Sequence, residues 1–397
     1  MNVSSSPISI PSYVTCLMER LEQAGHEVYL VGGSLRDCLL GIPAHDFDLA
    51  TSARPEETAA LFAELRVIET GMQHGTVTVL SDGQPVEITT FRIDGSYTDA
   101  RHPDSVQFTD RITDDLSRRD FTVNAMAYNP HIGLVDPFGG QADLAARVLR
   151  AVGEPHLRFG EDALRILRAF RFAAQLNFSI EAETLAAIAD CREGLSQIAK
   201  ERIASELLRL VMSDTPTPAL RLMQKTGVLP YVLGDYLPDE IVLDGLASMP
   251  KADAARLGFL LSATDRTQCA ELLRSLKYAN KQITGAGAVV SGSKLCVRSP
   301  VDARRLIASC GVYAPFAVRS SVLQGNSPVE AIAWVEQNSG ACTLSELAVS
   351  GRDLLSAGLA GKQVGHMLAF LLEQVLQHPE WNEKERLLQL ALEHKDV

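Results

Sequence analysis

Two aspartates separated by a single residue, Asp46 and Asp48, are the side chains best placed to do chemistry in this chain. They stand where a short strand is expected, and alternate residues of a strand point to the same face of a sheet. Asp46 and Asp48 would therefore project together, with Phe47 turned into the core. Two carboxylates this close repel each other, and a divalent cation relieves the repulsion. Hard oxygen ligands suit Mg²⁺, which proteins often share between carboxylates and substrate phosphates.

A paired-glycine turn precedes the two acids. Residues 29–37 read YLVGGSLRD, so an apolar strand runs directly into Gly32 and Gly33. Glycines let the backbone approach an anion closely, and Arg36 adds a positive charge. The pattern predicts a metal-dependent phosphoryl-transfer site for a nucleoside triphosphate, with Gly33 and Arg36 against the triphosphate and Mg²⁺ as the metal.

At this spacing the two motifs resemble the head of the class II nucleotidyltransferases of the polymerase-beta superfamily. That class holds the tRNA CCA-adding enzymes and the bacterial poly(A) polymerases. Residues 118–125, RRDFTVNA, are similar to the second motif of the family, and residues 161–165, EDALR, match its Glu-Asp-x-x-Arg motif in full. Weaker similarities to family motifs occur at residues 136–144, 199–206 and 350–355.

The resemblance implies a role for each matching residue. Arg119 would contact the triphosphate, while Asp120 and Asn124 would lie near the sugar. Arginine offers donors and aspartate offers acceptors, so Asp162 and Arg165 together can address the Watson–Crick edge of cytosine or adenine. The same pair is mismatched to uracil and guanine, which makes the protein itself the template in this family.

Residues 161–172 predict a helix with an apolar side and a charged ridge. Asp162, Arg165, Arg168 and Arg171 follow one another at i, i+3 spacing along that ridge. Arg168 and Arg171 would hold phosphate or shape the pocket. The structural alternatives are an ordinary solvated face for this ridge and an ion-paired helix N-terminus for the second motif.

Glu87 is a third candidate acid, on a strand expected next to that of Asp46. It would face inward, as a third carboxylate near the metals or as the base that accepts the 3′-hydroxyl proton. Pairing with Arg92 or another arginine is an equally open interpretation. Residues 92–108 are polar and carry no strand signal. They match a flexible loop that full CCA-adding enzymes use to switch from C to A, or form an ordinary surface loop in which His102 is not a ligand.

Composition bounds the class of protein. The chain has 397 residues, 46% hydrophobic and 22% charged, which indicates a globular protein of about two to four domains. No apolar run reaches the ~18–20 residues that span a membrane. The seven cysteines are scattered without a Cys-x-x-Cys pair, so reduced thiols and a cytoplasmic location are expected. Because the net charge is −12, nucleic-acid binding would need a local basic surface, and arginines do gather between residues 111 and 171.

The pattern of elements predicts a mixed α/β head followed by an all-helical neck, body and tail. The resemblance implies that this head is an α/β nucleotidyltransferase head with a polymerase-beta-like mixed sheet. Helices are expected at 12–25, at 34–40 and from Pro55. Strands are expected at 28–32, 46–50, 67–68, 76–80 and 86–91. Strand signals stop near residue 145. The expected parts are a catalytic head at 1–145 and a base-recognising neck at 146–210. A tRNA-binding body at 211–340 and a tRNA-binding tail at 341–397 follow.

The resemblance implies template-independent addition of CCA to the 3′ end of tRNA from CTP and ATP, with pyrophosphate released. Asp46 and Asp48 would hold Mg²⁺, and the body and tail would grip tRNA by shape and phosphates. An A-adding specialist and a poly(A) polymerase are alternatives within the family. A catalytically silent RNA- or nucleotide-binding protein is the alternative from another class. The sequence does not indicate the oligomeric state.

Overall fold

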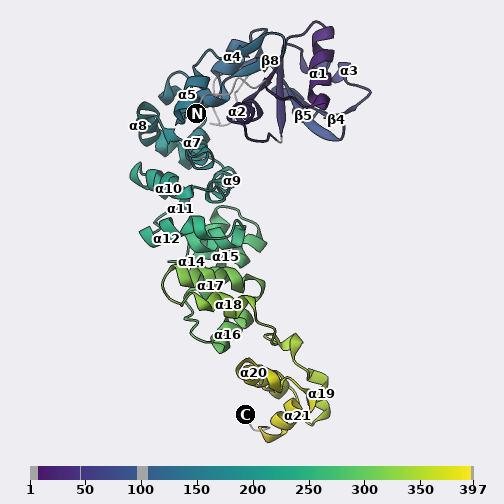
Figure 1. Ribbon diagram of the computed structural model, residues 1–397, viewed down its shortest axis with the longest axis vertical. Coiled ribbons are helices and arrows are strands. Elements are labelled where there is room, and N and C mark those ends of the chain that lie inside the picture. The colour runs from purple at the N-terminus through teal and green to yellow at the C-terminus, as the bar shows by residue number, and fades with distance from the viewer. Residues whose placement is uncertain (1–7, 45, 96–105, 395–397) are drawn as a thin grey trace. The chain divides into compact units, whose positions relative to one another are not determined.

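The computed structural model describes residues 8–44, 46–95 and 106–394. The chain forms two compact units, Met1–Asp235 and Tyr236–Val397 (Figure 1). The first unit contains a mixed sheet and the helices that follow it, and the described part of the second unit is helical. The predicted fold class is therefore confirmed. The finer division into head, neck, body and tail stays a prediction.

A seven-stranded sheet forms the core of the first unit, in the order β3-β4-β5-β2-β1-β8-β9. Its strands are β1 (Val28–Val31), β2 (Phe47–Thr51), β3 (Arg66–Ile68), β4 (Thr76–Ser81), β5 (Gln84–Thr90), β8 (Ala127–Asn129) and β9 (Gly133–Val135). Within this sheet, β2 and β5 are the one described pair that runs parallel, and their register sets Asp48 beside Glu87. Paired residues of neighbouring strands point to the same face, so both carboxylates leave the sheet on one side. Phe47 turns the other way and is buried, as predicted.

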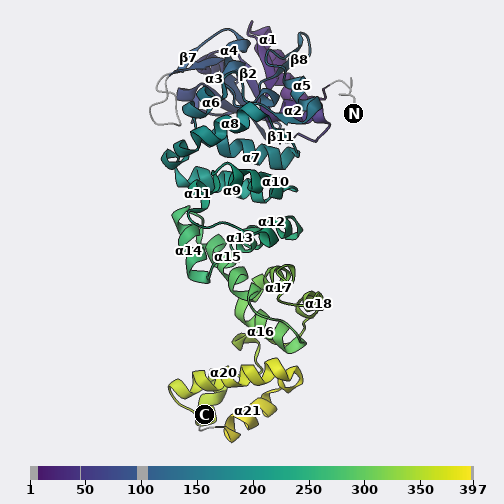
Figure 2. The ribbon, with the colours of Figure 1, turned by 90° about the vertical axis from the view of Figure 1, so that its left-hand side faces the viewer.

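Helices pack against the sheet and continue beyond it (Figure 2). Those of the first unit are α1 (Ser12–Gln23), α2 (Gly32–Leu40), α3 (Pro55–Leu61), α4 (Ile112–Ser117), α5 (Gly140–Ala146), α6 (Pro155–Glu161), α7 (Leu164–Leu176), α8 (Ala182–Cys191), α9 (Lys200–Val211), α10 (Pro216–Lys225) and α11 (Leu229–Leu233). The amphipathic pattern of α1 is confirmed, because its apolar residues are the buried ones. Helix α7 packs against both α9 and α10.

Two expectations about strands are wrong. Strand signals do not stop at residue 145, because β10 (Val148–Leu149) pairs with β11 (Ser179–Ile180). The segment 92–108 is not strandless either, because β6 (Arg92–Asp94) and β7 (Val106–Phe108) form an antiparallel pair at its ends. Both pairs are very short, so neither shows the alternation over four or more residues by which a strand is recognised in a sequence. Residues 96–105, with His102, lie outside the described residues.

The second unit is built from helix pairs. Its helices are α12 (Glu240–Gly245), α13 (Asp253–Leu260), α14 (Arg266–Ser275), α15 (Asn280–Ser293), α16 (Pro300–Cys310), α17 (Ala314–Leu323), α18 (Glu330–Glu336), α19 (Gly351–Ser356), α20 (Lys362–Gln377) and α21 (Lys384–Glu393). The seven cysteines, all within the described ranges, are free thiols.

The segment Pro300–Leu323 is the one described stretch whose length and composition alone would allow it to cross a membrane. It is two helices rather than one, because α16 ends at Cys310 and Gly311 follows with a φ of 55°. Apolar residues of α16 and α17 pack with α18 in a buried cluster that includes Leu306, Val318 and Val335. These contacts are those of helices in a folded core.

In the motif at residues 350–355, the serine and the aspartate have structural roles. The Ser350 side chain caps α19 and exchanges hydrogen bonds with Asp353 in a capping box. Asp353 also forms an ion pair with Lys384 at the start of α21, at 2.5 Å. These contacts join α19 to α21 and account for part of the motif without a ligand.

Gly140 offers a test of the packing where α5 meets the sheet region. A Cβ built on this buried glycine would lie 2.3 Å from the Thr122 carbonyl oxygen and 2.8 Å from the Met126 side chain. Because backbone cannot move away cheaply, Gly140→Ala is expected to lower the free energy of unfolding by about 1–3 kcal/mol or more. Gly160→Ala is the matched control, since nothing lies within 4 Å of its Cβ position. Urea unfolding of both variants measures the difference, and equal stabilities would contradict this account.

Candidate active site

A cleft of about 510 Å³ opens in the first unit between the sheet and the helices α7 and α9. The structure brings ten of the twelve predicted site residues to its wall: Gly33, Arg36, Asp48, Glu87, Arg119, Asp120, Asn124, Asp162, Arg165 and Arg168. Residues separated by more than a hundred positions in the sequence thus share one cavity. Asp46 and Arg171 are not part of this wall.

Acidic groups crowd one wall of the cleft. The pKa of Asp48 is raised to about 6, chiefly by burial and then by the negative charges of Glu87 and Asp46, while the cation of Arg119 works against them. Asp46 is exposed just before β2, and Glu87 is exposed on β5, where it lines the cleft in register with Asp48. Carboxylates that repel one another are a suitable donor set for a hard divalent cation. Among the described residues, no three acidic, histidine or cysteine side chains are already gathered as metal ligands.

Helix α2 begins at the paired glycines and directs its N-terminus to the cleft. Gly32 has a φ of 73°, which favours glycine, and a Cβ there would lie 3.4 Å from Arg119 Nη1 and 3.6 Å from Asp48 Oδ2. Arg36 is buried beneath this turn and donates to Asn124 Oδ1 at 2.8 Å and to Asp37 Oδ1 at 2.9 Å. The free N–H groups at a helix start attract anions, so this end of the cleft suits phosphate.

Asp115, on α4, forms ion pairs with both arginines of the second motif. This carboxylate is fully buried and pairs with Arg118 at 2.7 Å and with Arg119 at 3.0 Å. Burial opposes ionisation of Asp115, but the two guanidinium groups outweigh it and lower its pKa. The arginines of this motif are therefore ion-paired, as the structural alternative expected, and they also line the cleft.

Asp120 binds groups of the head and of α7 at once. Its Oδ1 accepts from the Phe121 N–H at 2.8 Å and from Asn124 Nδ2 at 3.1 Å, while its Oδ2 accepts from Arg168 Nε at 2.7 Å. Arg168 Nη2 lies 2.6 Å from the same Oδ2. Burial would raise the pKa of Asp120, but Arg168 and Asn124 lower it to about 2. A carboxylate has about four acceptor sites, so a sugar hydroxyl would have to displace one of these donors.

The predicted ridge is wrong at its first residue. Helix α7 begins at Leu164, and Asp162 lies before it with φ −144° and ψ 102°. Asp162 Oδ1 accepts from the Leu164 N–H at 2.9 Å, and its Oδ2 pairs with Arg202 of α9 at 2.8 Å. Arg165 is buried rather than solvated; it pairs with Glu161 at 2.5 Å and donates to two backbone carbonyls. Asp162 therefore reaches the cleft from the extended backbone between α6 and α7, whereas Arg165 reaches it from helix α7.

Arg171 turns away from the cleft. Its Nε lies 2.5 Å from Glu206 Oε2 on α9, and the two side chains are only 8% and 6% exposed. The guanidinium also covers the ring of Phe172, with its carbon 3.9 Å from the ring centre. Phe172 itself lines the cleft, and the guanidinium carbons of Arg36 and Arg168 each lie 5.2 Å from the same ring centre.

Sequence reasoning missed Phe172 and Arg202 as cleft residues. Phe172 follows the arginines of the predicted ridge at residues 162–171, and an aromatic ring is a common partner of guanidinium groups, so its type was a usable signal. Arg202 lies in the segment 199–206, which resembles a family motif but carries no indication of its distant partner.

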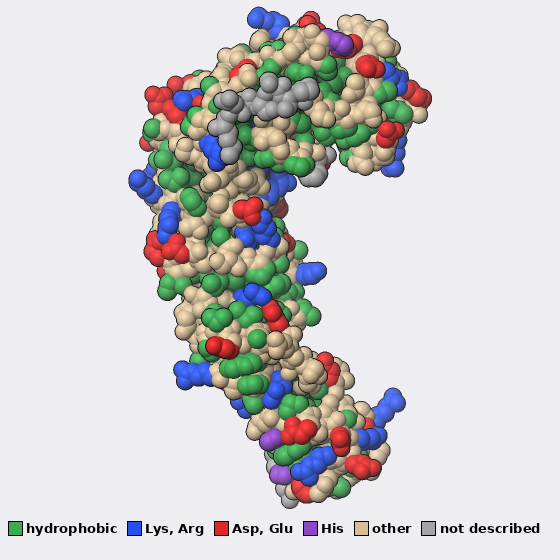
Figure 3. All heavy atoms as spheres, in the orientation of Figure 1, with side chains coloured by type: hydrophobic (Ala, Val, Ile, Leu, Met, Phe, Trp, Pro, Cys, Tyr) green, Lys and Arg blue, Asp and Glu red, His purple; other side chains and the backbone are tan. Residues whose placement is uncertain are grey.

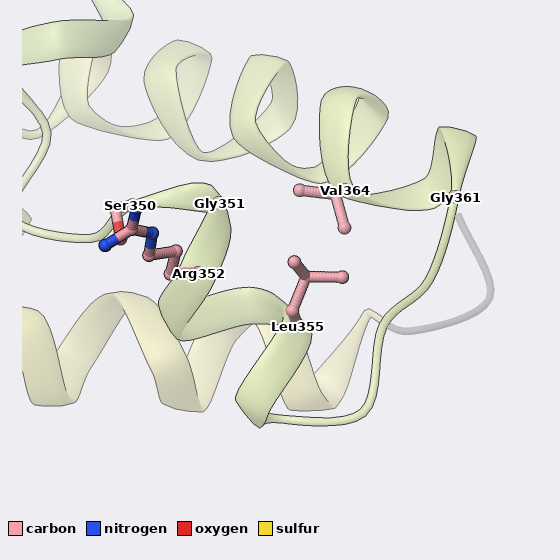
Figure 4. Close-up of a pocket in the computed structure, with 6 residues that line it drawn as sticks. All are labelled: Ser350, Gly351, Arg352, Leu355, Gly361 and Val364. Atoms are coloured by element: carbon pink, nitrogen blue, oxygen red, sulfur yellow. The ribbon is translucent and has the colours of Figure 1, made fainter.

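A second cavity, of about 800 Å³, lies in the second unit beside α19 and α20 (Figure 4). Leu355 and Val364 point toward one another across it, whereas the Arg352 side chain extends toward Ser350. None of the described residues that line this cavity is acidic, in contrast to the cleft of the first unit. Over the face drawn in Figure 3, basic and acidic side chains are interspersed.

Comparisons with known proteins cover most of the chain. The model of the poly(A) polymerase head domain matches residues 28–150, and the model named "Probable RNA and SrmB-binding site of polymerase A" matches residues 177–238. The model of tRNA nucleotidyltransferase domain 2 matches residues 251–391. The CCA-adding enzyme of Levilactobacillus brevis is 39% identical over 383 residues, which cover 94% of this chain and 95% of the relative. The chain belongs to the CCA-adding enzyme family.

Other relatives extend the likeness. The CCA-adding enzyme of Geobacillus stearothermophilus is 34% identical over 401 residues, which cover 95% of this chain and 95% of the relative. A crystal structure of the Bacillus stearothermophilus CCA-adding enzyme in complex with CTP has a TM-score of 0.83 and 32% identity, covering 97% of this chain and 98% of that one. The Thermotoga maritima CCA-adding enzyme complexed with tRNA has a TM-score of 0.70 over 98% of this chain, at 22% identity, which supports the fold.

The raised pKa of Asp48 predicts a pH-dependent stability in metal-free protein. A carboxyl whose pKa rises from 3.8 to about 6 on folding stabilises the fold at low pH, and that contribution is lost as the pH rises through about 6. Asp48→Asn should therefore raise the free energy of unfolding at pH 8 by about 1–3 kcal/mol, and the gain should vanish near pH 4.

Denaturant unfolding between pH 4 and pH 8 measures this difference, with the exposed Asp46→Asn as the control of smaller expected effect. Mg²⁺ should raise the melting temperature of the unaltered protein at pH 8, because a cation offsets the same repulsion, and should do so much less in Asp48→Asn. Parallel pH profiles for the two proteins would contradict the assignment.

The Arg171–Glu206 pair predicts a structural role for Arg171. Arg171→Met leaves a buried carboxylate unpaired and should cost about 3–5 kcal/mol of the free energy of unfolding. The double variant Arg171→Met with Glu206→Leu should recover most of this loss, because both charges are then removed. Unfolding curves measure the recovery, and the KM for CTP should stay within about threefold of the unaltered protein. A large rise in KM in the stable double variant would instead support the predicted phosphate contact.

Proposed function

We propose that the protein adds C, C and A to the 3′ end of tRNA from CTP and ATP, without a nucleic-acid template and with release of pyrophosphate. One observation carries the proposal: the same cleft is lined by the carboxylates Asp48 and Glu87 and by Asp162 and Arg165, the pair proposed to address the base. Membership of the CCA-adding enzyme family supports it. A nucleotide can thus have its phosphates and its base addressed at the same time.

The phosphate end of the site would be formed by α2 and by the second motif. Gly33 lets the triphosphate approach the helix N-terminus, while Arg36 supports the turn from below and Arg119 balances phosphate charge. Asn124 is the group best placed to meet the sugar, since Asp120 already accepts several hydrogen bonds. Arg168 holds Asp120 and thereby shapes the pocket.

The catalytic acids would be Asp46, Asp48 and Glu87. The family implies a divalent metal, and the oxygen donors of Asp46 and Asp48 suit Mg²⁺, which is shared readily with substrate phosphates. When bound, such a cation offsets the charge that develops on the reacting phosphate and makes the 3′-hydroxyl more acidic. Glu87, exposed on the cleft side of β5, is positioned to accept the hydroxyl proton.

Base selection would follow from complementary hydrogen bonding. Cytosine and adenine each show an exocyclic amino donor beside a ring-nitrogen acceptor. Asp162 would accept from the amino group, and Arg165 would donate to the ring nitrogen while releasing part of its contact with Glu161. Uracil and guanine present a carbonyl oxygen where Asp162 needs a donor, so they are rejected.

The remaining parts would serve the tRNA. The division proposed is a head (1–145), a neck that reads the base (146–210), and a body (211–340) and tail (341–397) that grip tRNA by shape and phosphates. The proposed location is the cytoplasm, where reduced thiols and tRNA are both found. An A-adding specialist would draw on the same cleft and would add only A, to a tRNA that already ends in CC.

Three tRNA transcripts, ending before CCA, after C and after CC, test the proposal. Each is incubated with the protein, Mg²⁺ and CTP, ATP or both, and product lengths are read on a gel. All three should be completed to CCA, UTP and GTP should not be used, and Asp48→Ala should reduce incorporation by at least about 10³-fold. Extension of only the CC-ending transcript would identify an A-adding specialist, and long ATP-only tails a poly(A) polymerase. No extension would place the protein among RNA- or nucleotide-binding proteins.

A further inference from the structure

We infer that Arg202 is a positioning residue for nucleotide selection, which fixes the carboxylate of Asp162 in the orientation that accepts CTP and ATP and rejects UTP and GTP. The inference rests on the proposed function and deepens it, because it concerns a residue forty positions beyond the base-facing acid. Arg202 itself need not touch the base.

The contact between the two side chains is specific in geometry. Arg202 Nη2 donates to Asp162 Oδ2 at 2.8 Å, and Arg202 Nη1 lies 3.5 Å from Asp162 Oδ1. Both side chains line the cleft, where they are 24% and 13% exposed. A guanidinium fork facing both oxygens of a carboxylate defines the plane of that carboxylate, which a single point charge does not.

Asp162 needs such a partner because its backbone lies outside both neighbouring helices. It follows α6 with an extended conformation, φ −144° and ψ 102°, and α7 begins only at Leu164. One local contact orients the side chain: Oδ1 accepts from the Leu164 N–H at 2.9 Å. That contact alone leaves the carboxylate free to pivot about Oδ1, and Arg202 is what fixes Oδ2. An acceptor site then remains on Oδ2 for the amino group of a base.

A second ion pair on the same helix shows what a purely structural contact looks like. Glu206 stands four residues after Arg202 on α9 and pairs with Arg171 away from the cleft wall, with both side chains under 9% exposed. The Arg202–Asp162 pair is instead partly open to the cleft that holds Asp48 and Glu87. Partly exposed single ion pairs contribute little stability, typically about 0–1 kcal/mol, so stability is a weak reason for this one.

Loss of the fork should change selection more than it changes catalysis. A carboxylate that can pivot no longer meets the O4 of uracil or the O6 of guanine in a fixed acceptor–acceptor clash. Hydrogen-bond sites owe their selectivity to unpaired groups that cannot move away, and this one would gain that freedom. The preference for CTP over UTP, expressed as a ratio of kcat/KM, should therefore fall by about 10- to 100-fold in Arg202→Gln.

The test uses the full chain with a tRNA transcript that lacks CCA, and measures kcat and KM for CTP and UTP. A transcript ending in CC gives the same values for ATP and GTP. Arg202→Lys keeps the charge but not the fork and should show an intermediate loss of preference. Arg209→Gln is the matched control, because Arg209 lies on the same helix, is exposed and is absent from the cleft wall. Melting temperatures establish that each variant is folded, and Arg202→Lys carries the test if Arg202→Gln is not.

The outcomes separate the inference from the function on which it rests. A fall in the CTP-to-UTP and ATP-to-GTP preferences, with unchanged preferences in Arg209→Gln, supports the positioning role. Unchanged preferences in folded Arg202 variants overturn it. An equal rise in KM for all four nucleotides also overturns it, because that result indicates direct contact with a shared part of the nucleotide. If the unaltered protein adds no C, C and A, the proposed function fails and the inference fails with it.

Discussion

The cleft depends above all on one buried carboxylate, that of Asp120. It accepts from the backbone and from Asn124 on the sheet side, and from Arg168 of α7 on the other. Asn124 in turn accepts from Arg36 below the glycine turn, so a continuous chain of hydrogen bonds joins the glycine turn at the start of α2 to helix α7. Because Arg168 and Asn124 hold the pKa of Asp120 near 2 against burial, the link persists at every pH in which the protein would work.

The same arrangement explains how an acidic protein can offer arginines to a polyanion. Arg118 and Arg119 are paired with Asp115, and Arg165 with Glu161, before any substrate arrives. These acids cancel much of the positive charge that a basic patch would present, but they also fix each guanidinium in place. Substrate binding then requires less loss of side-chain freedom, since the acids have already ordered the groups concerned. Asp48 is different, because no cation fully offsets its crowded carboxylates.

Strand-borne acids could be predicted from the sequence, whereas the helical charges could not. The period of a strand is two, so Asp48 and Phe47 had to face opposite sides, and the β4–β5 hairpin carries Glu87 into register beside Asp48. On a helix each i, i+3 step turns a side chain by about 60°, and two steps carry Arg171 about 120° around α7 from Arg165. Arg171, the last residue of the predicted ridge, therefore no longer faces the cleft. The interruption of the helix before Leu164 could not be predicted from the sequence either, because the partner that holds Asp162 lies forty residues away.

Helix α9 forms two different ion pairs from one of its faces. Two of its side chains, four residues apart and so on one face, reach opposite ends of the segment that carries the residues proposed to face the base. Glu206 binds Arg171 in the second half of α7, and Arg202 binds Asp162 before its start. The buried contact sets where α7 lies, and the cleft contact sets how Asp162 points. Stiffness of the neck and choice of nucleotide would then be two consequences of one helix face, which a change at either contact can separate.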